Sequence, residues 1–508
     1  MGPTIAIHKR RITFGHWTRY VILAISVICL TLLTSNCLIL NFTIICMSDD
    51  DSLTNSTASG RLLENGLRYH YSSTQKGLLF SAVALGTLLG TVAVVRLSTF
   101  ISIRKLFTAF GVISGISTIF LPQLASFGFY WLFIARICAG SRLSSYRLDY
   151  VTMVDFSRQW NVSLPIVLSF SGATLILLRI SECEKNNRRQ LSRHNFQLGP
   201  MLTMPLSGAL CVSSLGWAYA YYFIGTLTLL AFLLFYIIFR DSPRFHTIVS
   251  EKELKIIERG KNVITKRQQK VPYGSLLKSI RIWAIWTLCT GGTFGFQLFF
   301  QYAPIYLNKV LHFEVESTGF ATAMPYVFSM IIKVCTGPLS DHAPCMSEKA
   351  RVMMFTFISQ GTMAACFLCL AVIPPEMSTL GQVAYTAAIA FSGMNWAGGI
   401  RCAQLVARQH VHFVLAVLSV ISCTIILILP AVVSTLAPNN THKEWSLIFY
   451  IVFGMIVASN TFFALAADTK PAKWTGAKTS TVYSVPTTLD DMGSFKKERY
   501  PAHEEAPA

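Results

Sequence analysis

The stretch GPLSDHAPCMSEKAR, residues Gly337 to Arg351, lies between two long apolar runs, FATAMPYVFSMIIKVCT (Phe320–Thr336) and VMMFTFISQGTMAACFLCLAV (Val352–Val372). About 20 consecutive apolar residues are enough to span a lipid bilayer, so each run is a candidate transmembrane helix. The stretch between them is short and carries charged residues. It therefore predicts a tight polar connection between two membrane spans.

The composition of the whole chain extends this prediction. Of 508 residues, 53% are hydrophobic and 13% are charged, whereas a soluble domain carries about 25% charged residues. Long apolar runs recur along the chain, and in lipid only helices and closed barrels satisfy their own backbone hydrogen bonds. The sequence therefore indicates an all-α, multi-pass membrane protein whose solvent is the lipid bilayer.

The net charge of +19 would suggest a nucleic acid partner in a soluble protein, but membrane proteins collect Lys and Arg in cytoplasmic loops. We therefore predict no nucleic acid partner. Most of the 13 cysteines lie inside apolar runs, where they act as small packing residues. We predict no metal site, and no cofactor other than a coupling ion.

Apolar runs divide the chain into two halves. The first half, residues 20–239, contains predicted spans at Tyr20–Met47, Lys76–Val95, Leu106–Ser126, Phe129–Gly140, a fifth span that includes Pro200 and Pro205, and Ala220–Phe239. The second half, residues 282–467, contains predicted spans at Ile282–Leu307, Thr318–Thr336, Val352–Ile373, Leu380–Gly399, Val411–Leu436 and Ser446–Ala467.

The remaining segments fit an arrangement with both termini in the cytoplasm. Residues 1–19 contain His-Lys-Arg-Arg before the first span, and residues 240–281 form a predominantly basic central loop. Residues 468–508 read as a disordered cytoplasmic tail. The loop after the first span is acidic and carries a glycosylation sequon at Asn55, which favours the outer or lumenal side.

Residues 141–195 are atypical. They contain an apolar run, Val162–Leu178, that is followed by several basic residues. If that run were an ordinary span, those basic residues would lie on the outer side of the membrane. Every later loop would also lie on the opposite side from the one that the positive-inside rule predicts. We therefore predict an irregular region between the fourth and fifth spans that lies on the membrane, re-enters it or replaces part of the fifth span. Altered splicing or a faulty gene model is the alternative.

Six spans, a basic loop and six further spans form the plan of the major facilitator superfamily. GPLSD followed by basic residues resembles the signature that this superfamily carries in the cytoplasmic loop between its eighth and ninth helices. Gly337 permits a tight exit from the helix, and Asp341 can face helix N-termini or pair with Lys349 or Arg351. These four residues form a predicted cytoplasmic gate. A plain positive-inside loop is the alternative.

Further stretches are similar to one family within that superfamily, the anion and sodium-phosphate cotransporters, the group of sialin and the vesicular glutamate transporters. The similarity runs from about Trp17 to Trp474 with a gap at residues 141–195. The stretches that carry it include WTRYVILAI, LNFTIICM, QKGLLFSAVALGTLLG, MPLSGAL, DSPRFHTIVSEKELKIIERG, FGFQLFFQYAPIYLNKVLHF and DTKPAKW.

The resemblance also implies a set of charged substrate ligands, and most of them are absent from this chain. The positions of the family's cationic residues in the first and seventh helices hold Ile39 and Thr290, and its second-helix histidine corresponds to about Phe80. The fourth-helix arginine remains, as Arg136. Because a substrate with two carboxylates favours more than one cation, we do not predict glutamate as the substrate.

Arg136 is the strongest candidate for substrate binding, because a charge inside a membrane span is costly and usually functional. The alternative is that it extends to the lipid headgroups from a short helix. The other candidates are polar residues in apolar runs: Asn36, Asn41, Gln297, Gln301, Tyr302 and Asn395. They line a predicted water-filled cavity, or alternatively hydrogen-bond between helices.

The sequence therefore predicts a secondary active transporter of a small organic or inorganic anion, with alternating access and coupling to Na+ or H+. The alternative is a transport-inactive relative that serves as a receptor or assembly partner. No catalytic arrangement supports an enzyme, and His410 and His412 fall at a helix start where a solvated face is favoured. The plasma membrane and a vesicle or lysosome membrane both fit, and the sequence leaves the oligomeric state open.

Overall fold

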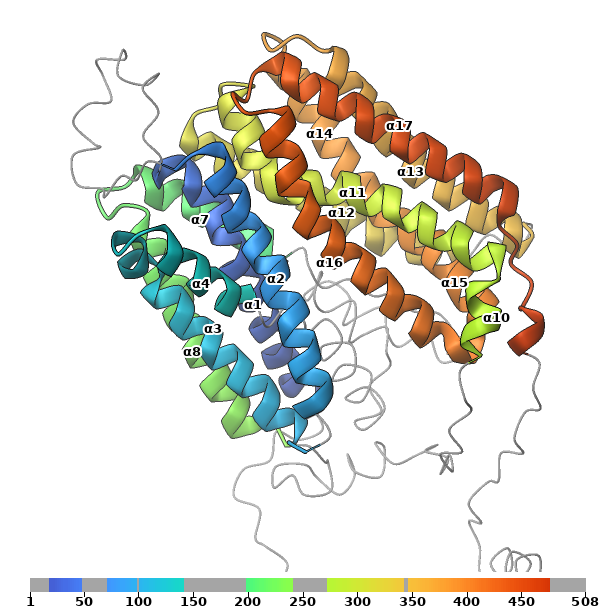
Figure 1. Cartoon of the computed structure of the whole chain (residues 1–508), viewed down its shortest axis with the longest axis horizontal. Coiled ribbons are helices and arrows are strands. Elements are labelled where there is room, and N and C mark those ends of the chain that lie inside the picture. The colour runs from blue at the N-terminus through green and yellow to red at the C-terminus, as the bar shows by residue number, and fades with distance from the viewer. Residues whose placement is uncertain are drawn as a thin grey trace, which may run out of the picture.

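A computed structural model describes residues 18–47, 71–97, 100–140, 198–240, 272–341 and 346–475. The predicted glycosylation site Asn55, the atypical region 141–195 and most of the predicted tail lie outside these residues. The described part of the chain consists of helices and short connections (Figure 1).

The N-terminal helices form one bundle, coloured blue to green in Figure 1. They are α1 (Thr18–Met47), α2 (Ser73–Leu97), α3 (Ile103–Ser126), α4 (Phe129–Gly140), α7 (Leu198–Val212) and α8 (Ala218–Ile238). Pro122 and Pro205 lie inside α3 and α7. In a membrane span, neighbouring helices and side chains can satisfy the backbone groups that proline leaves free.

The C-terminal helices form the second bundle, coloured yellow to red. They are the short α10 (Tyr273–Leu277), then α11 (Ile280–Lys309), α12 (Val315–Asp341), α13 (Glu348–Val372), α14 (Ser378–Ser392), α15 (Gly399–Ala407), α16 (Val411–Leu436) and α17 (His442–Ala466). With α14 and α15 together as one span, the described residues of the two bundles form six spans each. The predicted twelve-helix arrangement in two halves is confirmed.

The tenth span differs from the prediction. We expected one helix over Leu380–Gly399, but α14 ends at Ser392, a 3-10 turn η5 covers Gly393–Trp396, and α15 continues to Ala407. Glycines at 393, 398 and 399 allow neighbouring helices to approach this break closely. The predicted span therefore ended at Gly399, where α15 begins, and left that helix out.

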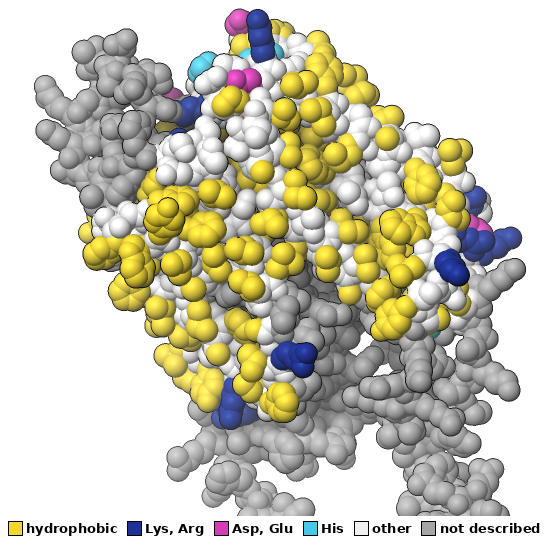
Figure 2. All heavy atoms as spheres, in the orientation of Figure 1, with side chains coloured by type: hydrophobic (Ala, Val, Ile, Leu, Met, Phe, Trp, Pro, Cys, Tyr) yellow, Lys and Arg dark blue, Asp and Glu magenta, His cyan; other side chains and the backbone are white. Residues whose placement is uncertain are grey.

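Hydrophobic side chains cover much of the surface in Figure 2, and the charged side chains in that view lie toward the ends of the bundles. Exposed leucine, isoleucine and phenylalanine side chains occur along α3, α8, α12 and α16. Seven of the described helices are long and apolar enough to cross a membrane. This surface suits a bilayer, as the composition predicts.

The two halves contact each other near one end of the molecule. We call it the predicted outer end, where α1 ends and α2 begins, and we call the opposite end the predicted cytoplasmic end. The Ser81 hydroxyl donates to the Leu427 carbonyl of α16, and the Ser73 hydroxyl donates to the Pro438 carbonyl just after that helix, both at 2.9 Å. Toward the other end, α2 and α16 diverge (Figure 1).

Helices α7 and α12 form the second contact between the halves. A Cβ placed on Gly319 would lie 2.8 Å from the Met204 carbonyl oxygen and 3.3 Å from the Gly208 Cα. Glycine therefore permits the backbones to touch, as small residues do where membrane helices cross closely.

A disulfide joins Cys46, at the end of α1, to Cys211, near the end of α7. We assigned the cysteines of the chain to packing and did not anticipate this bond. Nothing in the sequence spacing points to it, because 165 residues separate the two cysteines. It links two helices of the N-terminal half at the predicted outer end.

Residues 467–475, which follow α17, form a strap across the predicted cytoplasmic end of the C-terminal half. Asp468 pairs with Arg281 at 3.0 Å, and the Ala472 N–H donates to the Val406 carbonyl at 3.2 Å. Trp474 lies against the His410 ring, with centroids 5.8 Å apart. The expectation of a solvated His410 is therefore wrong, because the strap covers it and leaves it 4% exposed.

Candidate functional site

A cavity lies between the halves, near the middle of the membrane spans. Its lining residues come from α1, α2 and α4 of the N-terminal half and from α11 and α16 of the C-terminal half. The empty space in the cavity and at its mouth is about 470 Å³. The residues that line it are Thr34, Cys37, Leu38, Asn41, Phe80, Val83, Arg136, Gln297, Phe300, Gln301 and Ile426.

Among the described residues that line the cavity, Arg136 is the one with a charged side chain. It lies on α4 and is fully buried, and its Nη1 donates to the Cys37 carbonyl of α1 at 3.1 Å. The alternative that it extends to the headgroups is not what the structure shows. The α1 backbone instead holds the guanidinium at the cavity wall, where it supplies a positive charge in a medium of low dielectric.

Two amides on α11 face the same space. Gln297 and Gln301 are one turn apart, and Gln301 is 4% exposed. Neither amide atom of Gln301 has a hydrogen-bond partner among the described residues, and the same holds for Oε1 of Gln297. Leaving such groups buried and unsatisfied costs about 1–3 kcal/mol each. A polar ligand or water in the cavity would remove that cost.

The structure separates the other sequence candidates. Asn41 lines the cavity from α1. Asn36, one turn earlier, donates to Ser114 and Thr228 at 3.1 Å and therefore joins α1 to α3 and α8. Tyr302 is not part of the cavity lining and packs edge-to-face on Phe80 at 5.1 Å. Asn395 lies in the break η5.

Apolar side chains complete the cavity wall. Leu38 and Phe80 come from α1 and α2, and Phe300 and Ile426 come from α11 and α16. The wall therefore combines one cation, three amides and a large apolar area. This is the usual composition of a small-molecule site, in which a few polar groups fix the orientation.

The predicted gate residues lie at the predicted cytoplasmic end of the C-terminal half. Gly337 and Asp341 belong to the last turns of α12, and the Asp341 side chain is outside the described part of the structure. Lys349 is exposed in the first turn of α13. Arg351, one turn into that helix, is 8% exposed and pairs with Glu348.

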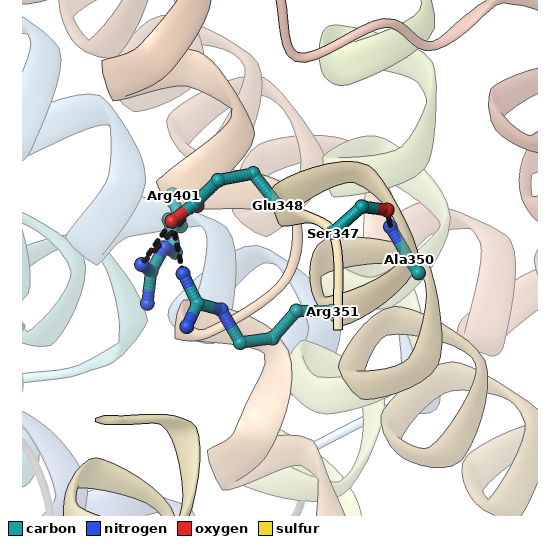
Figure 3. A network of polar contacts seen from close by, with 5 residues as sticks. All are labelled: Ser347, Glu348, Ala350, Arg351 and Arg401. Carbon is teal, nitrogen blue, oxygen red and sulfur yellow. Dashed lines mark hydrogen bonds and ion pairs between the residues drawn. The ribbon is translucent and has the colours of Figure 1, made fainter. Parts of the chain in front are cut away.

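Glu348 connects α13 to α15 at this end (Figure 3). It follows the N-cap Ser347, whose hydroxyl accepts a hydrogen bond from the Ala350 N–H. Its carboxylate pairs with Arg351 and, at 3.2 Å, with Arg401 of α15. The sequence prediction missed Arg401 because it ended the tenth span before this residue.

Glu348→Gln is expected to destabilise the protein by about 1–2 kcal/mol. The change leaves two buried guanidinium groups beside a neutral amide, but the cost is limited because Glu348 is 49% exposed. Thermal unfolding of the purified protein would measure it. A matched control is Glu376→Gln, an exposed position in the connection before α14. Equal unfolding temperatures for both variants would contradict a stabilising role of Glu348.

Comparison with known proteins agrees with this architecture. Residues 196–430 match the family model described as Major Facilitator Superfamily. Two solved transporters have the same fold. A bacterial homologue of the human lysosomal transporter Spinster, inward-facing and occupied, has a TM-score of 0.60 at 13% identity, covering 89% of this chain and 97% of that one. A D-xylose-proton symporter has a TM-score of 0.56 at 14% identity, covering 91% and 99%.

Curated relatives are similar over most of their length. Sodium-dependent phosphate transport protein 1 of Oryctolagus cuniculus is 24% identical over 476 residues, covering 91% of this chain and 96% of the relative. Sialin of Homo sapiens is 23% identical over 422 residues, covering 81% and 79%. The resemblance inferred from the sequence motifs is confirmed.

Proposed function

We propose that this chain is a transporter of the major facilitator superfamily and that it carries a small anion bearing one negative charge. The observation that supports the proposal is Arg136, a fully buried cation in a cavity between the two halves. A bound anion would offset the cost of burying that charge.

The number of charges in the cavity limits the substrate. Arg136 supplies one positive charge, and none of the described residues in the lining is acidic. A monoanion is therefore neutralised, but a dianion would bring an uncompensated negative charge into a medium of low dielectric. The amides of Gln297 and Gln301 suit a carboxylate or hydroxyl, and Phe80 and Phe300 suit an apolar body. One of the relatives named above is a sodium-dependent phosphate transport protein and another is sialin. These relatives support an anion as the substrate, without specifying which one.

The proposed mechanism is alternating access of this central site. The halves contact each other at the predicted outer end and diverge at the other. Orientation with both termini in the cytoplasm is supported by Arg96, Arg104 and Lys105 at the predicted cytoplasmic end. The disulfide Cys46–Cys211 at the opposite end also supports it, because disulfides persist in oxidising compartments. The conformation would then be open toward the cytoplasm.

We propose Na+ or H+ as the coupling ion, and the plasma membrane or a vesicle or lysosome membrane as the location. The gate at Gly337, Asp341, Lys349 and Arg351 and a glycan at Asn55 remain proposals. A transport-inactive relative acting as a receptor or assembly partner is not favoured, because an intact cavity contains both Arg136 and polar groups that a ligand can satisfy.

Uptake by proteoliposomes tests the proposal. Labelled phosphate, an aromatic monocarboxylate such as benzoate, and a dicarboxylate without an amino group, such as succinate, would be offered under imposed Na+, pH and voltage gradients. We expect gradient-driven uptake of a monoanion, with monoanions competing at least about 10-fold better than dicarboxylates, since one uncompensated charge costs more than about 1.4 kcal/mol. Preferred uptake of the dicarboxylate, or no uptake by folded protein, would contradict it.

A further inference from the structure

Helix α15 is a short segment of the tenth span with an irregular backbone at each end. The break η5 precedes it, and Arg408 follows it with a φ of 41°. Residues other than glycine rarely adopt a positive φ, so the Arg408 backbone is strained. Because no continuous α-helix joins α15 to α14 or α16, its position at the predicted cytoplasmic end (Figure 1) depends on what packs against it.

The strap packs along one face of α15. The Cys402 thiol donates to the Asp468 carbonyl at 3.7 Å. One turn later, the Val406 carbonyl accepts a hydrogen bond from the Ala472 N–H at 3.2 Å. Residues four positions apart lie on the same face of a helix. This face is fully covered, since Cys402 is 1% exposed and Val406 is 0% exposed.

The strap also holds the chain on both sides of the strained residue. Val406, which accepts from the strap at Ala472, precedes Arg408 by two positions. His410 follows Arg408 by two positions, and its ring lies against Trp474 of the strap. The conformation of Arg408 is therefore fixed by contacts that the strap makes before it and after it.

The start of the strap is attached to α11. The Asp468 carboxylate pairs with Arg281 at 3.0 Å, and Nη1 of this arginine donates to the Lys470 carbonyl at 3.2 Å. The Arg281 and Asp468 side chains are 36% and 26% exposed, and an ion pair that faces water contributes little stability. The strap can therefore detach without unfolding of the half that it covers.

We propose that the strap is a latch that holds α15 in the position open toward the cytoplasm, and that its release lets α15 move about η5 to close that end. In the structure the strap is docked while the halves diverge at this end (Figure 1). Strained residues persist only where surrounding contacts hold them, so release of the strap lets Arg408 relax and favours the movement. The inference rests on the proposed alternating access, to which it adds a contact that controls one step.

Two further contacts fit a movement of α15. Arg401 of α15 pairs with Glu348, whose side chain is 49% exposed, so water can also replace this second attachment. Helix α16 begins at Val411, just after the strap contact, and carries Leu427, whose carbonyl accepts from Ser81 of α2. A change at the start of α16 therefore reaches the contact between the halves along one helix.

Cys402 reports whether the strap is docked, because it is not disulfide-bonded and lies beneath the strap. Peptide-level mass spectrometry would follow its reaction with N-ethylmaleimide in the purified full chain, without substrate. Labelling follows the population with a released strap, so we expect the Asp468→Asn/Trp474→Ala variant to react at least about 10-fold faster, equivalent to about 1.4 kcal/mol. The matched control is Trp131→Ala, at an exposed position on α4. Cys366, in the core of the C-terminal half, should stay unlabelled if that half remains folded.

Cys37 in the cavity lining reports which end is open. With a membrane-impermeant maleimide, its labelling from the predicted cytoplasmic side should fall in the Asp468→Asn/Trp474→Ala variant. Labelling from the predicted outer side should rise about 10-fold, because the population of a minor state follows the shift in the equilibrium. Adding Arg408→Gly should return the labelling of Cys37 toward that of the wild type, since glycine adopts a positive φ without strain.

Three outcomes would overturn the latch. The first is unchanged reactivity of Cys402, both in the double variant and in Trp474→Ala alone. The second is a reactive Cys402 with unchanged labelling of Cys37, as expected of a strap that only stabilises the fold. The third is an equal shift of Cys37 labelling with and without Arg408→Gly. Neither labelling reaction requires a substrate, so these outcomes are independent of the uptake experiment.

Discussion

Arg136→Gln is expected to lower gradient-driven uptake at least about 100-fold while leaving the protein folded. Removing one partner from a buried, charge-assisted contact costs about 3–5 kcal/mol, and about 2.7 kcal/mol already corresponds to a factor of 100. Glutamine retains hydrogen-bonding capacity toward the Cys37 carbonyl but has no charge for the anion. Arg136→Lys should recover part of the uptake, because it restores the charge without the planar guanidinium.

Two further measurements separate binding from structure. Arg104→Gln is the matched control, since Arg104 is a surface arginine whose Nε donates to the Tyr236 carbonyl at 2.9 Å. The unfolding temperature of the empty Arg136→Gln protein should not fall, because burying a charge is itself costly. Wild-type uptake by Arg136→Gln, or loss of uptake that accompanies loss of folding, would remove Arg136 from the substrate path.

Gly319→Leu is expected to prevent closure of the halves at the predicted outer end. Even a Cβ at this position would lie 2.8 Å from the Met204 carbonyl oxygen and 3.3 Å from Pro205 Cα. Overpacking costs about 1–3 kcal/mol, and a cost of 3 kcal/mol shifts a two-state equilibrium by about 150-fold. The variant should therefore populate the state open at that end, and uptake should fall at least about 10-fold.

Cys37 is a native reporter of this change, since it is not disulfide-bonded and lines the cavity. Peptide-level mass spectrometry after labelling with a membrane-impermeant maleimide would measure its access from each side. We expect labelling from the predicted cytoplasmic side in the wild type and from the predicted outer side in Gly319→Leu. The control is Gly361→Leu, where nothing lies within 4 Å of the added Cβ. Identical labelling of Cys37 in both variants would contradict a role of this contact in closure.

Patterns confined to one helix were predictable from the sequence. The span Val411–Leu436 was predicted with the bounds that α16 has, because the length of an apolar run and its flanking polar residues define a membrane helix without reference to its neighbours. The break within Leu380–Gly399 was not predicted. Several glycines occur there, but only the helices packed against them at Thr356 and Leu288 show why the span is interrupted.

The polar side chains of the site also show which features the sequence predicts and which only the structure reveals. Asn36 and Asn41 lie on α1 in the same apolar run, and their sequence context is nearly equivalent. The structure turns Asn36 toward Ser114 and Thr228 and Asn41 toward the cavity. Gln360 carried the same sequence signal, a polar group in an apolar run, and only its placement against Gly292 distinguishes it.

The sequence by itself determined that this chain spans a membrane as two six-helix halves, and it singled out Arg136, because hydrophobicity and isolated charge are properties of single segments. Only the tertiary structure decided that Arg136 lies with Gln297 and Gln301, that Glu348 joins Arg401, and that Cys46 meets Cys211. These pairs come from helices far apart in the chain. Their meeting depends on how helices cross, which is set by small residues and close packing at positions that no single segment reveals.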